Sequence, residues 1–367
     1  MAAKKKQETD GFSPVDQIKE YLEAHKSEHL NFEEETDYIV SSGSLLLDNE
    51  MAGGLRPSII RASGISEGGK TSCALSFAKN FQETVDNGMV VYIKAEGRLS
   101  ESMLERSGLN TSEEKLFIYK CNIFESVLQL MRQLIMNNPS KCKYFFIIDS
   151  MDALIPKGDF DIVYGGKDDA HKVAGGSVLS SAFLKQMALA LSTKGHICFM
   201  ISQVRSKVSV NKYEKGDPNL TNASGGNALL HYSDWILEFQ QRFNADRIPT
   251  DAKKQAEGHY CKIIFKKTTN EKTGTIVRYP IKYGRTNGAS IWTEYEILDF
   301  MTQWEMVDVK TSWITVADEI VSELKENGLE IKEKHQGADN FCKYLEENED
   351  IHDFLFKKFR AALTLNS

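Results

Sequence analysis

One stretch of the sequence reads Gly64-Ile65-Ser66-Glu67-Gly68-Gly69-Lys70-Thr71, the spacing G-x-x-x-x-G-K-T of a phosphate-binding P-loop. Its glycines allow the backbone to turn tightly enough for successive N–H groups to point at phosphate oxygens. Lys70 is expected to reach the β- and γ-phosphates of a nucleotide, and the Thr71 hydroxyl is expected to hold Mg²⁺. The stretch therefore predicts a nucleotide-binding site.

The residues on either side of this stretch predict a strand, a loop and a helix in succession. Pro57–Ser63 has the composition of a short strand that enters the loop, and Ser72–Asn80 that of the helix that leaves it. Because the N-terminus of a helix favours an anion, Ser72 joins the predicted phosphate-binding residues. The alternative is a glycine-rich turn that matches the spacing by accident, and the flanking strand and helix argue against it.

Composition places the chain among soluble globular proteins. It has 367 residues, 41% hydrophobic and 26% charged, which is enough apolar material for a large core and about two domains. The net charge of −7 means that any nucleic-acid binding must be local. The six cysteines form no CxxC or Cys/His cluster, no apolar run approaches a membrane span, and the N-terminus lacks a signal peptide. These features predict a cytoplasmic protein without a membrane partner.

Apolar strands and amphipathic helices alternate after the P-loop, which predicts an α/β fold with a mostly parallel, buried sheet. The clearest of these strands is Tyr144–Asp149, a run of bulky apolar residues that ends in an aspartate. In open α/β sheets ligands bind at the carboxyl ends of the strands, so Asp149 is expected to hold Mg²⁺ together with Thr71. An ordinary buried strand with an exposed terminal aspartate is the alternative, which the upstream P-loop disfavours.

The remaining segments predict the organisation of the chain. Residues 157–175 and 206–227 are polar and long for internal connections, and Gly175-Gly176 prolongs the first of them, so we expect these segments to be functional or mobile. Three later strands, near residues 235–240, 260–267 and 275–283, are typical of a hairpin or meander. Helices dominate from about residue 294. We expect an N-terminal tail and helix over 1–35, an ATPase core over 36–300, and a small C-terminal domain over 301–367. The N-terminal helix packs either on its own domain or, as an oligomerisation helix, on a neighbouring subunit.

The order of these motifs resembles that of RecA-type homologous-recombination proteins, from about residue 12 to the C-terminus. The resemblance rests on Ser41–Asp48, Gly53-Gly54-Leu55, Ala95-Glu96, Ile147–Pro156, Ile201-Ser-Gln-Val-Arg205, Gly225-Gly-Asn-Ala-Leu229 and Gly337–Leu363. The segments at 201–205 and 225–229 are the most specific, because P-loop proteins at large do not share them. The resemblance implies a RecA-type P-loop ATPase core with a mostly parallel sheet, an N-terminal helix and a small α-rich C-terminal domain.

The resemblance also assigns roles to single residues. It implies that Glu96 orients or deprotonates the attacking water, and that Gln203 senses the γ-phosphate and signals to the adjacent DNA-binding loop. The catalytic residues that the resemblance implies are therefore Glu96, Gln203 and Lys70. The segments 157–175 and 206–227 would line the filament axis and contact DNA, mainly its backbone. The residues implied in DNA binding are Lys172, Gly175, Gly176, Ser177, Arg205, Lys207, Gly225, Gly226, Asn227 and Ala228. Charge alone would make the basic ones an ordinary solvated surface.

In RecA filaments ATP lies between subunits, and lysines of the neighbouring subunit complete the site. Lys266 and Lys267 fall at the matching place, although the second of the family's two lysines falls on Thr268. Other departures from the family are Lys94 in place of an acidic residue and Met103 in place of the aromatic residue that stacks on adenine. His231 replaces a phenylalanine that relays signals across the subunit interface.

The function implied is that of a DNA-dependent ATPase. With ATP and Mg²⁺ it would form a helical filament of its own copies on single-stranded DNA and catalyse pairing and strand exchange with homologous double-stranded DNA. Single-strand-binding and loader proteins would be its partners, and its place the cytoplasm and nucleoid of a bacterium or phage-infected host. The departures, in a chain rich in Lys and Asn, indicate a bacteriophage source.

Two alternatives remain at this point. One is a non-catalytic recombination mediator that binds ATP and DNA, which the changes at Lys94, Met103 and His231 motivate. The other is a hexameric helicase on the same core, which the segment 225–229 and the C-terminal region disfavour.

Overall fold

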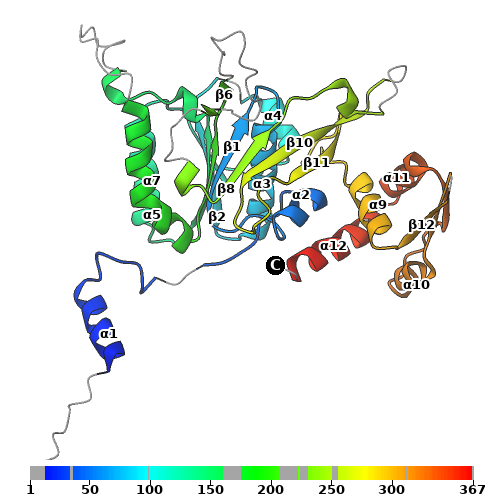
Figure 1. The fold of residues 1–367 in the computed structure, drawn as a ribbon, viewed down its shortest axis with the longest axis horizontal. Helices are drawn as coiled ribbons and strands as arrows, with labels where there is room; N and C mark the ends of the chain where they lie inside the picture. Colours follow the sequence, from blue (N-terminus) through cyan, green and yellow to red (C-terminus); the bar gives the residue numbers. More distant parts are fainter. Residues whose placement is uncertain are drawn as a thin grey trace, which may run out of the picture.

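The computed structural model describes residues 13–33, 36–97, 99–159, 175–205, 222–223, 230–249, 255–310 and 312–365. Along the chain these form helix α1 (Pro14–Ala24), a core built on a large sheet, and a C-terminal part of helices and short strands (Figure 1). Ser13 caps the N-terminus of α1, with the N–H of Val15 donating to the Ser13 hydroxyl at 3.3 Å. Among the described residues no helix is long and apolar enough to cross a membrane.

The central sheet has nine strands among the described residues, and most of its pairings are parallel. Its order is β11-β10-β8-β1-β5-β4-β2-β3, with β9 beside β10, and among the described strands of this sheet the antiparallel pairings are those of β10 with β8, β9 and β11. This confirms the predicted α/β fold and the hairpin near residue 270. The strands are β1 (Ile59–Gly64), β2 (Gly88–Lys94), β3 (Leu116–Tyr119), β4 (Lys143–Asp149), β5 (Ile197–Ile201), β8 (Trp235–Phe239), β9 (Arg247–Ile248), β10 (Gly258–Lys267) and β11 (Ile276–Lys282).

Helices cover both faces of this sheet and form two separate apolar cores (Figure 1). Because side chains alternate along a strand, Phe145 and Ile147 of β4 enter one core, and Phe146 and Ile148 enter the other. The first core contains α3 (Lys70–Thr84), and the second contains α5 (Phe124–Met136) and α7 (Gly175–Thr193). Each fully buried side chain of this size contributes about 1.5–3 kcal/mol. Helix α4 (Glu101–Ser107) packs beside α3.

A short hairpin closes the base of the second polar segment. Strands β6 (Val204–Arg205) and β7 (Asn222–Ala223) pair in antiparallel register, with Val204 opposite Ala223. Residues 206–221, between them, lie outside the described part of the chain. Only two residues, Ser202 and Gln203, separate the end of β5 from the start of the hairpin, so the segment is tied directly to the carboxyl edge of the central sheet.

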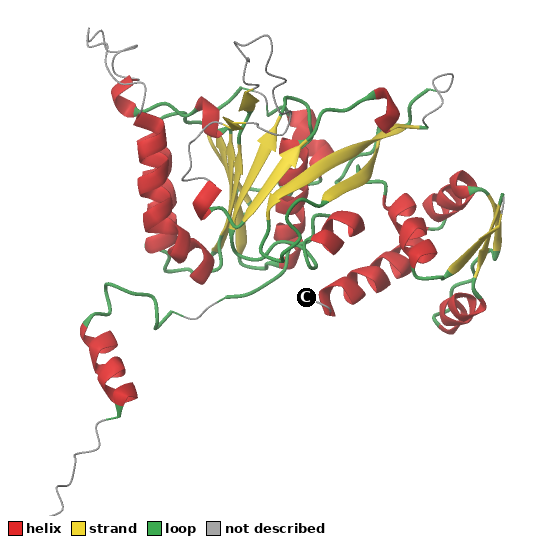
Figure 2. Ribbon diagram, viewed as in Figure 1, coloured by secondary structure: helices red, strands yellow, loops and turns green. Residues whose placement is uncertain are grey.

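The C-terminal part contains a small sheet that the sequence analysis missed (Figure 2). Its strands are three or four residues long, too short to show a clear alternation of apolar and polar residues. They form one antiparallel sheet beside four helices, whose apolar side chains make a third core with Leu45 from helix α2 (Leu45–Glu50). The elements are α9 (Thr293–Gln303), β12 (Val307–Lys310), β13 (Trp313–Val316), α10 (Asp318–Glu326), β14 (Lys334–Gln336), α11 (Ala338–Glu347) and α12 (Glu349–Leu365).

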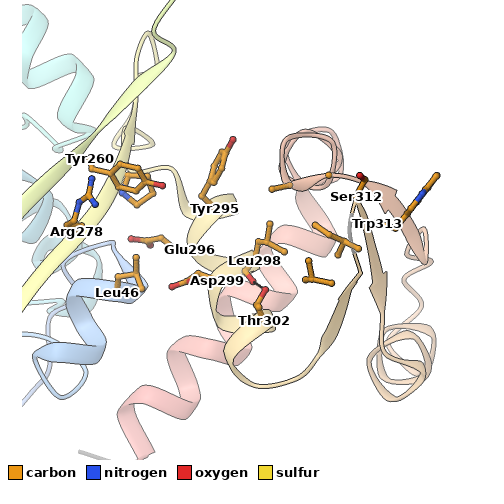
Figure 3. Close-up of a pocket in the computed structure, with 15 residues that line it drawn as sticks. Leu46, Tyr260, Arg278, Tyr295, Glu296, Leu298, Asp299, Thr302, Ser312 and Trp313 are labelled. Atoms are coloured by element: carbon orange, nitrogen blue, oxygen red, sulfur yellow. Dashed lines mark hydrogen bonds between the residues drawn. The ribbon is translucent and has the colours of Figure 1, made fainter. Parts of the chain in front are cut away.

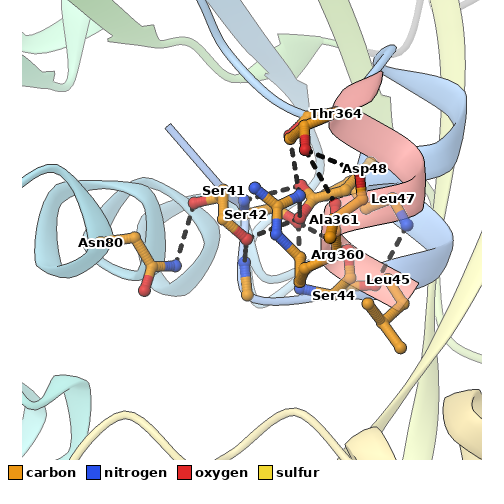
Figure 4. Close-up of polar contacts among 12 residues, drawn as sticks. Ser41, Ser42, Ser44, Leu45, Leu47, Asp48, Asn80, Arg360, Ala361 and Thr364 are labelled. Carbon is orange, nitrogen blue, oxygen red and sulfur yellow. Dashed lines mark hydrogen bonds and ion pairs between the residues drawn. The ribbon is translucent and has the colours of Figure 1, made fainter. Parts of the chain in front are cut away.

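A buried ion pair joins the last helix to α2, just before the P-loop strand (Figure 4). The carboxylate of Asp48 is fully buried and lies 2.6 Å from the guanidinium of Arg360. It also accepts hydrogen bonds from the hydroxyl of Ser41 at 2.6 Å and the backbone N–H of Ser42 at 2.7 Å. Arg360 donates as well to the carbonyl of Gly53 at 2.8 Å. Both charges are therefore compensated, as burial requires.

A second buried acid lies at the same joint. Glu296 of α9 is fully buried, and it accepts hydrogen bonds from the hydroxyl of Ser44 and from the N–H of Leu45 at 2.8 Å. Burial raises the pKa of Glu296 to about 8. The folded protein therefore keeps a proton on this group over a pH range in which the unfolded chain has lost it.

This difference predicts a pH dependence of stability. The stabilisation is fully present below the usual glutamate range, near pH 4.5, and is lost as the pH rises through about 8. Glu296→Gln cannot ionise, so the variant should gain stability relative to the wild-type chain between pH 5 and pH 8, by more than about 1 kcal/mol. Urea unfolding at both pH values measures this gain. Glu319→Gln, which changes an exposed acid, should give no such gain; parallel pH curves for wild-type chain and Glu296→Gln would show that Glu296 is not the titrating group.

Candidate active site

The predicted P-loop connects β1 to α3, as its sequence indicates. Gly64, the last residue of β1, lies beside Phe239 of β8 in parallel register and has φ +141°. A Cβ atom on Gly64 would lie 2.3 Å from the carbonyl oxygen of Phe239. Gly69, with φ +101°, caps the N-terminus of α3, which begins at Lys70. The loop therefore depends on glycine at both of its ends.

Lys70 is buried at the centre of the loop, with 7% of its surface exposed. Its ammonium group donates to the carbonyl of Gly64 at 2.9 Å and to that of Ile65. Burial lowers the pKa of Lys70, and the nearby carboxylates, Asp149 first among them, act against this. Lys70 thus places a compact cation where the loop would surround phosphates.

Thr71 and Asp149 come together although 78 residues separate them in sequence. The Thr71 hydroxyl donates to Oδ2 of Asp149 at 2.9 Å, from the first turn of α3 to the end of β4. Two adjacent oxygen ligands of this kind suit Mg²⁺, which prefers hydroxyl, carboxylate and phosphate oxygens. The residues fit the metal that the sequence predicts.

Tyr92 of β2 joins this pair, and the sequence analysis did not single it out. Its phenol donates to the same Oδ2 of Asp149 at 2.6 Å. Burial and the charge of Asp149 raise the pKa of Tyr92, so the phenol keeps its proton and remains a donor. A tyrosine within an apolar strand was the only signal, and by itself it indicates no role.

Glu96 and Gln203 also meet. The side-chain amide of Gln203 donates to Oε1 of Glu96 at 3.3 Å, and the hydroxyl of Ser150 donates to the same oxygen. The N–H groups of Ala95 and Glu96 donate to the carbonyl of Asp149 at 3.0 and 3.1 Å, which fixes the turn after β2. The residues predicted for catalysis and for metal binding therefore form one cluster at the carboxyl edge of the sheet.

A pocket of about 670 Å³ lies beside the start of α3. Its size is that of a site for one small ligand or cofactor. Another pocket, of about 570 Å³, lies between the edge of the core sheet and α9, and contains none of the predicted site residues (Figure 3). Of these two pockets in the described part of the chain, the one beside α3 is therefore the candidate for the nucleotide site. Residues from the P-loop, from α4 and from the end of β11 line it, among them Glu67, Gly69, Ser72, Met103, Arg106 and Tyr283.

The predicted DNA-contacting residues fall largely outside the described residues: Lys172, Lys207 and Gly225–Ala228. The expectation that Gly175 and Gly176 prolong the first loop is wrong, because α7 begins at Gly175 and Ser177 lies in its first turn. A glycine pair does not exclude the first turn of a helix, where the backbone N–H groups have no intrahelical partner anyway. Arg205 lies in β6.

Lys266 and Lys267, at the end of β10, contact other residues of their own subunit. Lys266 lies 3.7 Å from Glu238, and Lys267 donates to the carbonyls of Leu230 and His231 at 3.2 and 2.9 Å. Within the described ranges neither lysine bonds to the P-loop. Their predicted role toward a neighbouring subunit stays a prediction.

Comparison with known proteins gives one consistent family. The family model described as RecA N-terminal domain matches residues 22–284, which is more than half of the chain. Protein RecA of Rippkaea orientalis is 28% identical over 332 residues, covering 89% of this chain and 84% of that protein. Protein RecA of Listeria ivanovii is 27% identical over 323 residues, covering 88% and 82%. Protein RecA of Picosynechococcus is 27% identical over 332 residues, covering 89% and 84%.

The close contact between Gly64 and Phe239 allows a test of whether the P-loop binds the nucleotide. Gly64→Ala should weaken the binding of a fluorescent ATP analogue at least tenfold and lower the thermal midpoint, because the new Cβ collides with backbone and the φ angle is strained. Gly158→Ala is the matched control, since a Cβ there meets nothing within 4 Å. Equal binding by Gly64→Ala and Gly158→Ala would mean that this loop does not hold the nucleotide.

Proposed function

Because the chain belongs to the RecA family, we propose that it is a DNA-dependent ATPase that forms a helical filament on single-stranded DNA and catalyses homologous pairing and strand exchange in recombination and repair. The observation that carries the proposal is the contact of Gln203 with Glu96 at the edge that also holds Lys70 and Asp149. A P-loop alone explains nucleotide binding. A side chain that joins the catalytic cluster to the strand leading into residues 206–221 supports a link between hydrolysis and a DNA-binding segment.

In the proposed site the phosphates of ATP lie on Gly64, Ile65, Ser66, Glu67, Gly68, Gly69, Lys70, Thr71 and Ser72, and the nucleoside occupies the pocket beside Met103 and Arg106. Thr71 and Asp149 would hold Mg²⁺, which supplies positive charge to the phosphates. Tyr92 and the backbone of Ala95 keep the carboxylate and carbonyl of Asp149 in place.

Glu96 acts on water in this mechanism. Its carboxylate orients the attacking water and accepts its proton. Both described hydrogen bonds, from Ser150 and Gln203, reach Oε1, and we assign Oε2 to the water. When a γ-phosphate is present, the amide of Gln203 leaves Oε1 for a phosphate oxygen. β6 begins at the residue after Gln203. The change of partner by the Gln203 side chain is therefore transmitted to β6 and to the polar segment that follows β6.

DNA binding in the proposal uses segments 157–175 and 206–227 together with the first turn of α7. The residues assigned to it are Lys172, Gly175, Gly176, Ser177, Arg205, Lys207, Gly225, Gly226, Asn227 and Ala228. Backbone N–H groups and the few cations would bind phosphates. This local arrangement suits a chain whose overall charge is −7.

Assembly in the proposal depends on α1. The helix has no buried residue, and Val15, Ile18 and Tyr21 are 55%, 59% and 60% exposed at helical spacing. We assign this face to a neighbouring copy, and Lys266 and Lys267 to the neighbour's nucleotide. The division into 1–35, 36–300 and 301–367 belongs to the same proposal. The proposal also includes single-strand-binding and loader proteins as partners. It places the protein on the nucleoid, in the cytoplasm of a bacterium or phage-infected host.

Two other functions lead to different observations. A non-catalytic mediator, which Lys94 beside Glu96 motivates, would bind ATP and DNA without DNA-stimulated turnover. A hexameric helicase would form closed rings, whereas the proposed recombinase forms helical filaments, and electron microscopy with ATP and DNA separates the two.

The role of Glu96 is tested by Glu96→Gln. This variant should still bind ATP and form filaments on single-stranded DNA, since the P-loop is intact, but its ATP turnover should fall at least about hundredfold because a general base is lost. Lys70→Ala is the companion variant and should lose both properties. Turnover of Glu96→Gln at the wild-type rate would show that another group activates the water.

The role of α1 is tested by deleting residues 1–30. The shortened chain should bind a fluorescent ATP analogue as the full chain does, since the described residues of α1 contribute nothing to the pocket. Its filaments on single-stranded DNA should be lost or much shorter in electron micrographs. The triple change Val15→Ser, Ile18→Ser, Tyr21→Ser should act in the same way, and normal filaments from it would exclude this face as the contact.

A further inference from the structure

An arginine is buried inside the strand that leads into the P-loop. Arg61 of β1 is 1% exposed, between the apolar residues Ile60 and Ala62. Its Nε donates to the hydroxyl of Ser202 at 3.1 Å. Burial lowers the pKa of Arg61, and the charge of Asp152 acts against this. The charge of Asp152 therefore offsets part of the cost of burying this guanidinium.

Asp152 lies in the turn after β4 and makes one short contact beyond it. Its Oδ2 accepts the backbone N–H of Gln203 at 2.6 Å. Its Oδ1 is buried and has no hydrogen-bond partner among the described residues. A charged acceptor gives a stronger hydrogen bond than a neutral one, so Gln203 is held firmly at its backbone.

Together the two charges fix the end of β5. Arg61 holds the side chain of Ser202, and Asp152 holds the backbone of Gln203, which is the next residue. Gln203 in turn donates its side-chain amide to Glu96 at 3.3 Å. The backbone N–H of Gln203 is therefore anchored at Asp152, and the side chain can exchange partners by turning about that point.

We propose that Asp152 is a positioning residue for ATP hydrolysis, which holds the backbone N–H of Gln203 so that the side-chain amide of Gln203 reaches Glu96 or a γ-phosphate, with Arg61 supplying a compensating charge. This inference rests on the proposed ATPase function. The role assigned to Asp152 is exerted through Gln203, whose N–H it accepts. The backbone N–H of Gln203 is then a fixed point between the hydrolytic cluster and the hairpin β6–β7.

A matched pair of double variants tests the hydrogen bond without an unpaired charge. Arg61→Met/Asp152→Asn keeps an oxygen that can accept from Gln203, whereas Arg61→Met/Asp152→Ala does not, and both lack the two charges. The Asn double variant should hydrolyse ATP on single-stranded DNA at least about tenfold faster than the Ala double variant, because small misplacements of a catalytic group are costly. Their KM values for ATP should agree within about threefold and their thermal midpoints should be similar, since P-loop and charge balance are the same. Asp86→Ala, at an exposed aspartate before β2, is the control.

Equal kcat values for the two double variants, with a wild-type chain that is active, overturn the inference and leave the proposed function standing. A wild-type chain without DNA-stimulated turnover overturns the proposed function and this inference with it. If a double variant does not fold, hydrogen–deuterium exchange on the wild-type chain decides. The amide of Gln203 should exchange at least about tenfold more slowly than that of exposed Gly97, and equally fast exchange overturns the inference.

Discussion

The parallel pairing of β1 with β5, β5 with β4 and β4 with β2 is the constraint from which the site follows. Four strands that run in one direction end at one edge, so the residues after them meet there whatever their distance in sequence. Lys70 follows β1, Glu96 follows β2, Asp149 ends β4, and Gln203 follows β5. A single antiparallel strand among these four would have sent one of these side chains to the opposite edge. The apolar cores on both faces stabilise this strand order, and the chemistry depends on them for that reason.

Two arrangements of buried charge in the described part of the chain differ in their surroundings. Asp48 and Arg360 make a close pair with several further hydrogen bonds and join two parts of the chain. Arg61 and Asp152 are each held mainly by other groups, and one oxygen of Asp152 is left without a described partner. A pair of the first kind contributes to a fixed shape. In the second arrangement Oδ1 of Asp152 is a buried polar atom without a described hydrogen-bond partner, next to the catalytic cluster. Such an atom lowers stability, and atoms of this kind are typical of functional sites.

The α/β fold, the P-loop and the aspartate that ends β4 could be predicted from the sequence, because these features depend on local patterns and spacing. The roles of four other residues could not be predicted from the sequence, because their contacts join residues 51 to 141 positions apart. These residues are Tyr92, Ser150, Arg61 and Asp152. Arg61 inside an apolar strand was a visible signal, but its partners were not. The small C-terminal sheet was missed because its strands are too short for periodicity, and α7 begins earlier than its glycines suggested. Each of these depends on tertiary contacts rather than on propensity.

The ion pair between Asp48 and Arg360 has a consequence for synthesis of the chain. A ribosome makes Asp48 more than three hundred residues before its partner, and chains in general fold from the N-terminus as they emerge. Until Arg360 has been made, the carboxylate of Asp48 has only hydrogen bonds from the Ser41 and Ser42 side of the pair, and α2 also lacks the apolar cover that Leu45 shares with α12. The last strands of the sheet and the P-loop are complete before then. The contact between α12 and α2 can therefore form only after residue 360 has been made, and a chain stopped shortly before that residue leaves a buried acid without its base.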